Sequence, residues 1–177
     1  MKNIKEILNR NEAVAFIDGS NNPKTHEYGY GGFIIYNDDF HVVYGKNNDP
    51  EMAKMRNVAG EIDGAMAIVK KAEELGCPKM TIFYDYEGIE AWATGAWQAK
   101  KEGTQSYVHF MNSKDRVVEI EFSHVYGHTG VVGNEIADMI AKQAVGVEIP
   151  KKQKELLDLQ IQCYYMGNQI LNDFRRD

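Results

Sequence analysis

The sequence predicts a single α/β domain in which helices cover the faces of a mixed β-sheet. Two observations support this. The chain has 177 residues, of which 44% are hydrophobic and 26% charged, which is typical of a globular protein with one core. Three apolar strands come first, and two more strands alternate with helices along the rest of the chain. Strand pairs joined by helices imply a mixed sheet with helical layers.

The first three strands are predicted at residues 12–18, 27–36 and 40–47. The first is an apolar run that ends in an Asp-Gly-Ser turn. The other two are separated by Asn37-Asp38-Asp39, which favours a β-hairpin. Three glycines in the second strand predict either a β-bulge or a close backbone approach: Gly29, Gly31 and Gly32.

The second half alternates helices and strands. A helix over 57–75 is predicted to end at Gly76 and Pro78. It is followed by a strand at 79–84, a helical pattern at 86–102 interrupted at Thr94-Gly95, a helix at 104–113, a strand at 117–125 and a helix from Asn134 to about Val145. Residues 151–173 carry apolar side chains at helical spacing. We therefore expect one domain at 1–150 and, at 151–177, a helical extension that packs on it.

Charge and cysteine content narrow the functional classes. The net charge is −6, which argues against nucleic-acid binding through bulk positive charge but leaves a local patch or a metal-mediated contact open. No apolar stretch is long enough for a membrane span, and the N-terminus lacks the apolar core of a secretory signal. Cys77 and Cys163 are far apart, so neither a disulfide framework nor a cysteine zinc site is expected. These features predict a cytoplasmic protein without a membrane partner.

Three carboxylates are candidates for a ligand or metal site. Asp18 and Asp85 each follow an apolar strand, and ligands of open α/β sheets bind outside the carboxyl ends of strands. Each could equally begin a turn. Glu61 lies on the otherwise apolar face of the helix at 57–75, where a carboxylate needs a partner or a metal. A solvated glutamate in the first helical turn is the alternative, and the two interpretations are equally supported.

The last helix and its preceding loop carry two further candidates. Asp138 alone is compatible with a solvated helical residue. His128, on a glycine-flanked loop ten residues earlier, is a natural proton carrier near neutral pH. A zinc site at His124 and His128 is disfavoured because the pair lacks a helix and further ligands.

Together these motifs resemble the type 1 ribonuclease H family. The resemblance covers residues 12–146 and is most similar to bacterial enzymes related to the viroplasmin-linked branch, without the N-terminal hybrid-binding domain often found there. It rests on five short segments in order: Ile17-Asp18-Gly19-Ser20, Asn57-Val58-Ala59-Gly60-Glu61, Phe83-Tyr84-Asp85, Gly127-His128-Thr129-Gly130 and Asn134-Glu135-Ile136-Ala137-Asp138.

The resemblance implies a five-stranded sheet of order 3-2-1-4-5 and an endoribonuclease that hydrolyses the RNA strand of RNA–DNA hybrids, leaving 5′-phosphate and 3′-hydroxyl ends. It implies two Mg²⁺ ions, with Mn²⁺ as a substitute, because hard cations prefer oxygen ligands and two of them can hold the attacking and leaving oxygens of a phosphate. The implied metal ligands are Asp18, Glu61, Asp85 and Asp138, with His128 as a catalytic helper.

The implied substrate contacts fall into two groups. Gly19, Ser20 and Asn57 match positions at the RNA strand, where the 2′-hydroxyl distinguishes RNA from DNA. Trp97, Lys100 and Lys101 are candidates for the DNA strand, with a solvated face as the alternative for the lysines. The chain departs from the family pattern at three positions, which affects substrate affinity and not metal chemistry: Val58, Glu87 and Tyr126.

Two other functions remain compatible with these residues. One is a non-catalytic module that binds hybrids or proteins, which a complete carboxylate set disfavours. The other is an acidic-site exonuclease of related fold, which usually has Asp-x-Glu on its first strand where this chain has Asp18-Gly19-Ser20. A monomer is expected, with a dimer through the apolar face of the C-terminal helix as the alternative.

Overall fold

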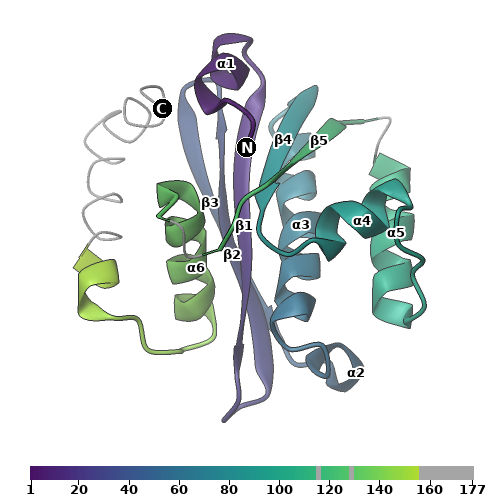
Figure 1. The fold of residues 1–177 in the computed structure, drawn as a ribbon, viewed down its shortest axis with the longest axis vertical. Coiled ribbons are helices and arrows are strands. Elements are labelled where there is room, and N and C mark those ends of the chain that lie inside the picture. The colour runs from purple at the N-terminus through teal and green to yellow at the C-terminus, as the bar shows by residue number, and fades with distance from the viewer. Residues whose placement is uncertain (115–116, 128–129, 156–177) are drawn as a thin grey trace.

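The computed structural model describes residues 1–114, 117–127 and 130–155. Five strands form one mixed sheet in the order β3-β2-β1-β4-β5. Helices lie on both faces, with α6 on one side and α3 and α5 on the other (Figure 1). The predicted fold class and strand order are confirmed.

The strands are β1 (Ala13–Asn22), β2 (Glu27–Tyr36), β3 (Asp39–Asn47), β4 (Lys79–Tyr84) and β5 (Glu119–His124). The helices are α1 (Ile4–Asn9), α2 (Pro50–Ala53), α3 (Asn57–Glu74), α4 (Gly88–Thr94), α5 (Glu102–Lys114) and α6 (Val132–Ala144). None of the helices in the described part of the chain is long and apolar enough to cross a membrane.

Strand β1 is the centre of the sheet. It pairs antiparallel with β2 and parallel with β4, with Phe16 opposite both Phe33 and Phe83. The hairpin between β2 and β3 has a two-residue connection, Asn37-Asp38, in which both residues have positive φ (52° and 63°). Asn and Asp tolerate this conformation, and a turn of this kind matches the twist of the flanking strands. The predicted hairpin is therefore confirmed.

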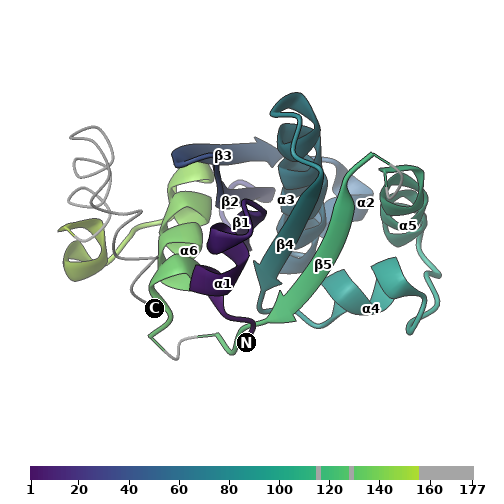
Figure 2. The ribbon, with the colours of Figure 1, turned by 90° about the horizontal axis from the view of Figure 1, so that it is seen from above.

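Each face of the sheet has its own hydrophobic core. Helices α1 and α6 cover a cluster built around four aromatic rings, and successive ring centroids lie 4.7–5.3 Å apart. Those rings are Phe16, Phe33, Phe40 and Phe83. On the opposite face, α3 and α5 cover a cluster rich in alanine and isoleucine. Figure 2 shows the two helical layers on either side of the strands.

Two glycines permit the closest helix–sheet contacts. A Cβ atom on Gly19 would lie 2.3 Å from the carbonyl oxygen of Asn57 and 2.5 Å from the Glu61 amide nitrogen, so α3 sits directly on the β1 backbone. A Cβ atom on Gly31 would lie 2.1 Å from the amide nitrogen of Ala141, so α6 packs equally closely against the β2 backbone. The register through β2 is continuous, and close packing, not a bulge, explains its glycines.

The structure differs from the sequence-based expectations in three places. The Asp18-Gly19-Ser20 segment, predicted as a turn, continues strand β1, which pairs with β2 as far as Asn22. The short helices α1 and α2 were not predicted because each is too brief to show a period. The helical pattern at 86–102 is helical only over α4, which Gly95 ends in the left-handed conformation (φ 82°). Residues 151–155 are helical, as predicted, and the rest of the predicted C-terminal helix lies outside the described residues.

Candidate metal centre and active site

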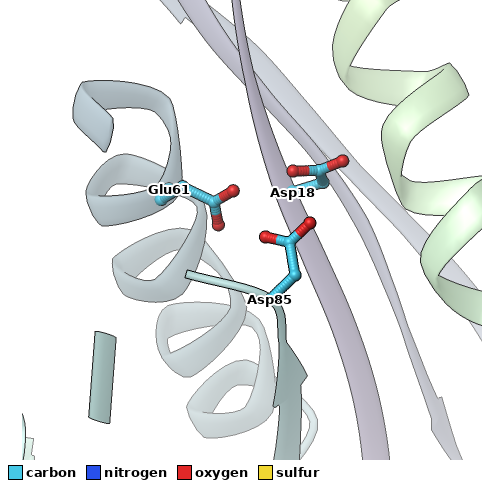
Figure 3. A group of neighbouring side chains, drawn as sticks. All are labelled: Asp18, Glu61 and Asp85. Carbon is cyan, nitrogen blue, oxygen red and sulfur yellow. The ribbon is translucent and has the colours of Figure 1, made fainter. Parts of the chain in front are cut away.

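Three carboxylates from separate elements converge at one edge of the sheet. Asp18 comes from β1, Glu61 from α3 and Asp85 from the residue that follows β4 (Figure 3). One carboxylate oxygen from each lies within 4.8 Å of the other two. These residues are 43 and 24 positions apart in the sequence, so only the fold brings them together.

Strand pairing explains why two of the carboxylates are neighbours. Because β1 and β4 run parallel, Asp18 within β1 and Asp85 just after β4 lie at corresponding positions, each two residues beyond the paired Phe16 and Phe83. His124 holds the second of these in place, with its Nε2 2.9 Å from the carbonyl oxygen of Asp85. That contact occupies the His124 ring nitrogen in a structural role.

The third carboxylate is positioned by the close contact at Gly19. The Gly19 amide donates to Asp18 Oδ1 at 2.8 Å and to Glu61 Oε1 at 3.1 Å, so one N–H links the two carboxylates. Glu61 is 4% exposed. The solvated interpretation of this residue is therefore wrong, and the buried one is correct.

Asp138 lies beside this group and has its own cationic partner. It is on α6, where its Oδ2 is 2.9 Å from Lys142 Nζ, one helical turn away. It lines the same cavity of about 280 Å³ as the other three carboxylates. The four predicted ligands thus share a cavity, with three in a tight cluster and Asp138 on its wall.

Burial and the neighbouring negative charges make Asp18 and Glu61 hard to ionise. Burial raises the pKa of Asp18 to about 7; a hydrogen bond with Glu61 opposes the shift, and the charges of Asp85 and Asp138 add to it. Burial also raises the pKa of Glu61, and the charge of Asp18 acts in the same direction. Carboxylates that share a site retain a proton until a positive charge arrives.

Two buried oxygen atoms at the cavity have no hydrogen-bond partner within the described part of the chain. They are Glu61 Oε2 and Asn134 Oδ1, and both residues line the cavity. Asn134 is one turn before Asp138 on α6 and is 5% exposed. A wall of hard, partly unpaired oxygens fits a divalent cation such as Mg²⁺, because such cations prefer oxygen ligands.

A second cavity adjoins the acidic one. It is lined by Trp92, Lys100 and Lys101, and it shares Val58 and Tyr86 with the acidic cavity. Trp97 is 42% exposed, and its ring lies 5.8 Å from that of Trp92. Aromatic and basic groups therefore lie next to the carboxylates.

The remaining predicted residues have different positions. Asn57 is exposed and lines the acidic cavity together with Gly19, whereas Ser20 is buried in β1. His128 lies outside the described residues, although neighbouring Gly127 is close to the cluster: a Cβ atom there would lie 3.2 Å from Asp85 Oδ2. The catalytic role of His128 stays a prediction.

Comparison with known proteins identifies the family to which this arrangement belongs. The sequence model of the RNase H family matches residues 10–146, which is most of the chain. The chain belongs to the RNase H family. The predicted resemblance is confirmed at this level, and membership identifies the chain as a nuclease of the hydrolase class. The viroplasmin-related branch stays a prediction.

One curated sequence relative and two solved structures illustrate what this RNase H family member is similar to. The ribonuclease H of Francisella tularensis subsp. novicida is 26% identical over 153 residues, covering 80% of this chain and 96% of the relative. The structure of RNase H1 from the archaeon Halobacterium salinarum has a TM-score of 0.62 at 20% identity, covering 76% of this chain and 98% of the other. LC11-RNase H1 in complex with an RNA/DNA hybrid has a TM-score of 0.60 at 13% identity, covering 76% and 99%.

Sequence reasoning gave no role to four residues that line the acidic cavity of this RNase H: Tyr86, Asn134, Glu135 and Gln153. Asn134 could have been found, since its spacing of four from Asp138 puts both on one helix face. Tyr86 could also have been found, because it directly follows Asp85 at the end of the predicted strand. Gln153 carried no such signal, because its position depends on how the chain turns back after α6.

Proposed function

We propose that this RNase H hydrolyses the RNA strand of RNA–DNA hybrids with two divalent cations, leaving 5′-phosphate and 3′-hydroxyl ends. The observation that carries the proposal is the cluster formed by the buried Asp18 and Glu61 with the half-buried Asp85, with oxygens within 4.8 Å of one another. A cluster of this kind is unfavourable in an unliganded protein and serves a purpose when cations neutralise it.

The carboxylates would hold the cations, with Asp18, Glu61, Asp85 and Asp138 as ligands. Bound Mg²⁺, or Mn²⁺ in its place, supplies an activated water and stabilises the charge on the leaving oxygen. The protein's own contribution is rigidity: the Gly19 amide fixes two carboxylates, and His124 fixes the backbone of the third. His128 would move a proton at the departing group.

Substrate contacts follow from what surrounds the cluster. Gly19 and Asn57 line the acidic cavity and would contact the RNA strand, with Ser20 behind them in β1. Trp97, Lys100 and Lys101 lie at or near the adjoining cavity and would contact the DNA strand. Stacking and local positive charge explain how a chain with net charge −6 could bind a polyanion.

A cleavage assay tests the proposal directly. Labelled RNA–DNA hybrid, single-stranded RNA and double-stranded DNA are each incubated with the protein and Mg²⁺, and in parallel with EDTA. We expect internal cleavage of the RNA strand of the hybrid only, and none in EDTA. Binding without cleavage would indicate a non-catalytic module, and degradation from a DNA end would indicate an exonuclease. A cytoplasmic location and a monomeric state stay predictions.

A further inference from the structure

The segment after the family-matched region returns to the acidic cavity. The RNase H match ends at residue 146, yet Gln153 lines the cavity together with Asp18 and Asp138. The family match therefore does not account for one wall of the cavity. That wall is contributed by the beginning of the C-terminal extension.

Several local contacts bring the segment back. Helix α6 ends with Gly146 in the left-handed conformation (φ 70°), and the Val147 amide donates to the carbonyl oxygen of Lys142 at 3.0 Å. Ile149 then packs against the hydrophobic cluster beneath α1 and α6. Residues 151–155 begin a new helical turn, closed by the bond from the Lys154 amide to the Pro150 carbonyl oxygen at 3.0 Å.

Within this turn one side chain differs from its neighbours. Lys151, Lys152 and Lys154 are exposed, whereas Gln153 is half-buried. Its Oε1 is buried and has no hydrogen-bond partner among the described residues. Glu61, which is 4% exposed and lines the same cavity, has an Oε2 that also lacks a partner among residues 1–114, 117–127 and 130–155.

An unpaired carboxamide oxygen among carboxylates requires a donor. Once a bound cation has displaced the protons that the cluster shares, its carboxylates only accept hydrogen bonds, so Asp18, Asp85 and Asp138 cannot then satisfy Gln153 Oε1. A divalent cation held by these carboxylates would bring donors with it, because Mg²⁺ retains several bound waters. Residues that hold such waters orient the first ligands and tune cation affinity.

We propose that Gln153 is a positioning residue of the metal centre, whose carboxamide oxygen accepts a hydrogen bond from a water bound to the cation. This inference rests on the proposed function, since it needs a cation at the carboxylates. It adds to that function a residue from outside the family match, supplied by the C-terminal extension of this chain.

Calorimetric titration of Mn²⁺ into the full-length, EDTA-treated protein tests the inference without substrate. Gln153→Leu keeps the size of the side chain and removes the oxygen, and we expect its Mn²⁺ affinity to fall by about 10-fold or more. Gln153→Glu keeps an acceptor and should bind Mn²⁺ at least as tightly as wild type. Gln143→Leu, at an exposed position late in α6, is the matched control and should bind like wild type.

The outcomes separate this inference from the proposed function. Asp85→Asn is titrated alongside: if it binds like wild type, the metal centre itself is wrong. If it loses binding while Gln153→Leu stays within twofold of wild type, only the role of Gln153 is wrong. Weakened binding in both Gln153→Leu and Gln153→Glu would contradict an acceptor role and indicate that the amide donates to a carboxylate. Should Gln153→Leu not fold, Gln153→Met serves the same test.

Discussion

Two regions only two residues apart on the same strands have opposite energetics. In the interior, Phe16 of β1 and Phe83 of β4 stack with ring centroids 4.7 Å apart and are fully buried. Two residues further along the chain, Asp18 within β1 and Asp85 just after β4 approach each other and Glu61. The first contact stabilises the chain by itself, because burial removes apolar surface from water. The second contact is repulsive between ionised carboxylates and becomes favourable only when a cation neutralises their charge.

The difference teaches which region determines the fold and which determines the activity. Two hydrophobic cores hold β1 and β4 in place: aromatic packing on one face of the sheet and packing of α3 on the other. Neither depends on the charge state of the carboxylates. The carboxylates can then be held close together despite their repulsion. A change at the aromatic stack should therefore alter stability, whereas a change at the cluster should alter activity and cation response.

The largest expected effect is on cleavage. Asp85→Asn removes a charged oxygen from the cluster, and hybrid hydrolysis with Mg²⁺ should fall by several orders of magnitude while far-UV circular dichroism stays like that of wild type. Asp39→Asn, at the exposed start of β3, is the control and should retain full activity. Turnover of Asp85→Asn within tenfold of wild type would contradict the claim that the carboxylate cluster determines the activity.

The aromatic end is tested by Phe16→Ala. Truncation of a fully buried ring leaves a cavity and should lower the free energy of unfolding by about 3–5 kcal/mol, measured by urea denaturation. The folded fraction should still cleave the hybrid at low temperature. A stable but inactive Phe16→Ala protein would show that the two regions are not separable.

A smaller effect is expected at the loop histidine. His128→Ala should reduce the rate of hybrid cleavage by about 10²-fold, because proton transfer helps the reaction without holding the cation. Mn²⁺ affinity should stay unchanged. His109→Ala, on the exposed face of α5, is the matched control. A variant as inactive as Asp85→Asn would contradict the helper role.

The pH dependence of stability sharpens the comparison further. The pKa of Asp18 rises from 3.8 to about 7 on folding, so between these values the folded protein binds more protons than the unfolded chain. The free energy of unfolding without metal should therefore fall as pH rises through this window, by at most about 1.4 kcal/mol per pH unit for one proton. Thermal melting in EDTA from pH 4.5 to 8 measures it. An Asp18→Asn variant should show a shallower slope, and an equal slope would contradict the assignment.

Sequence patterns predicted the scaffold better than the site. Apolar runs and turn residues identified all five strands, because buried strands and an Asn-Asp turn leave local signals. The position of Glu61 on an apolar face indicated burial, but the choice between a buried and a solvated carboxylate needed the contact with Gly19. Gln153 was not predictable, because its place depends on the turn at Gly146 and on packing of Ile149. The extent of the C-terminal extension stays a prediction.

The most direct test of the central claim is the effect of Mg²⁺ on melting temperature at pH 8, where the buried cluster is least protonated. A cation that binds only the folded protein stabilises it by about 2.7 kcal/mol at a hundredfold excess over its dissociation constant. For a chain of this length, that predicts a rise of roughly 5–10 °C. Asp85→Asn should lose most of the rise, and Phe16→Ala should keep it from a lower starting temperature. A wild-type melting temperature unchanged by millimolar Mg²⁺ would contradict a cation site at Asp18, Glu61 and Asp85.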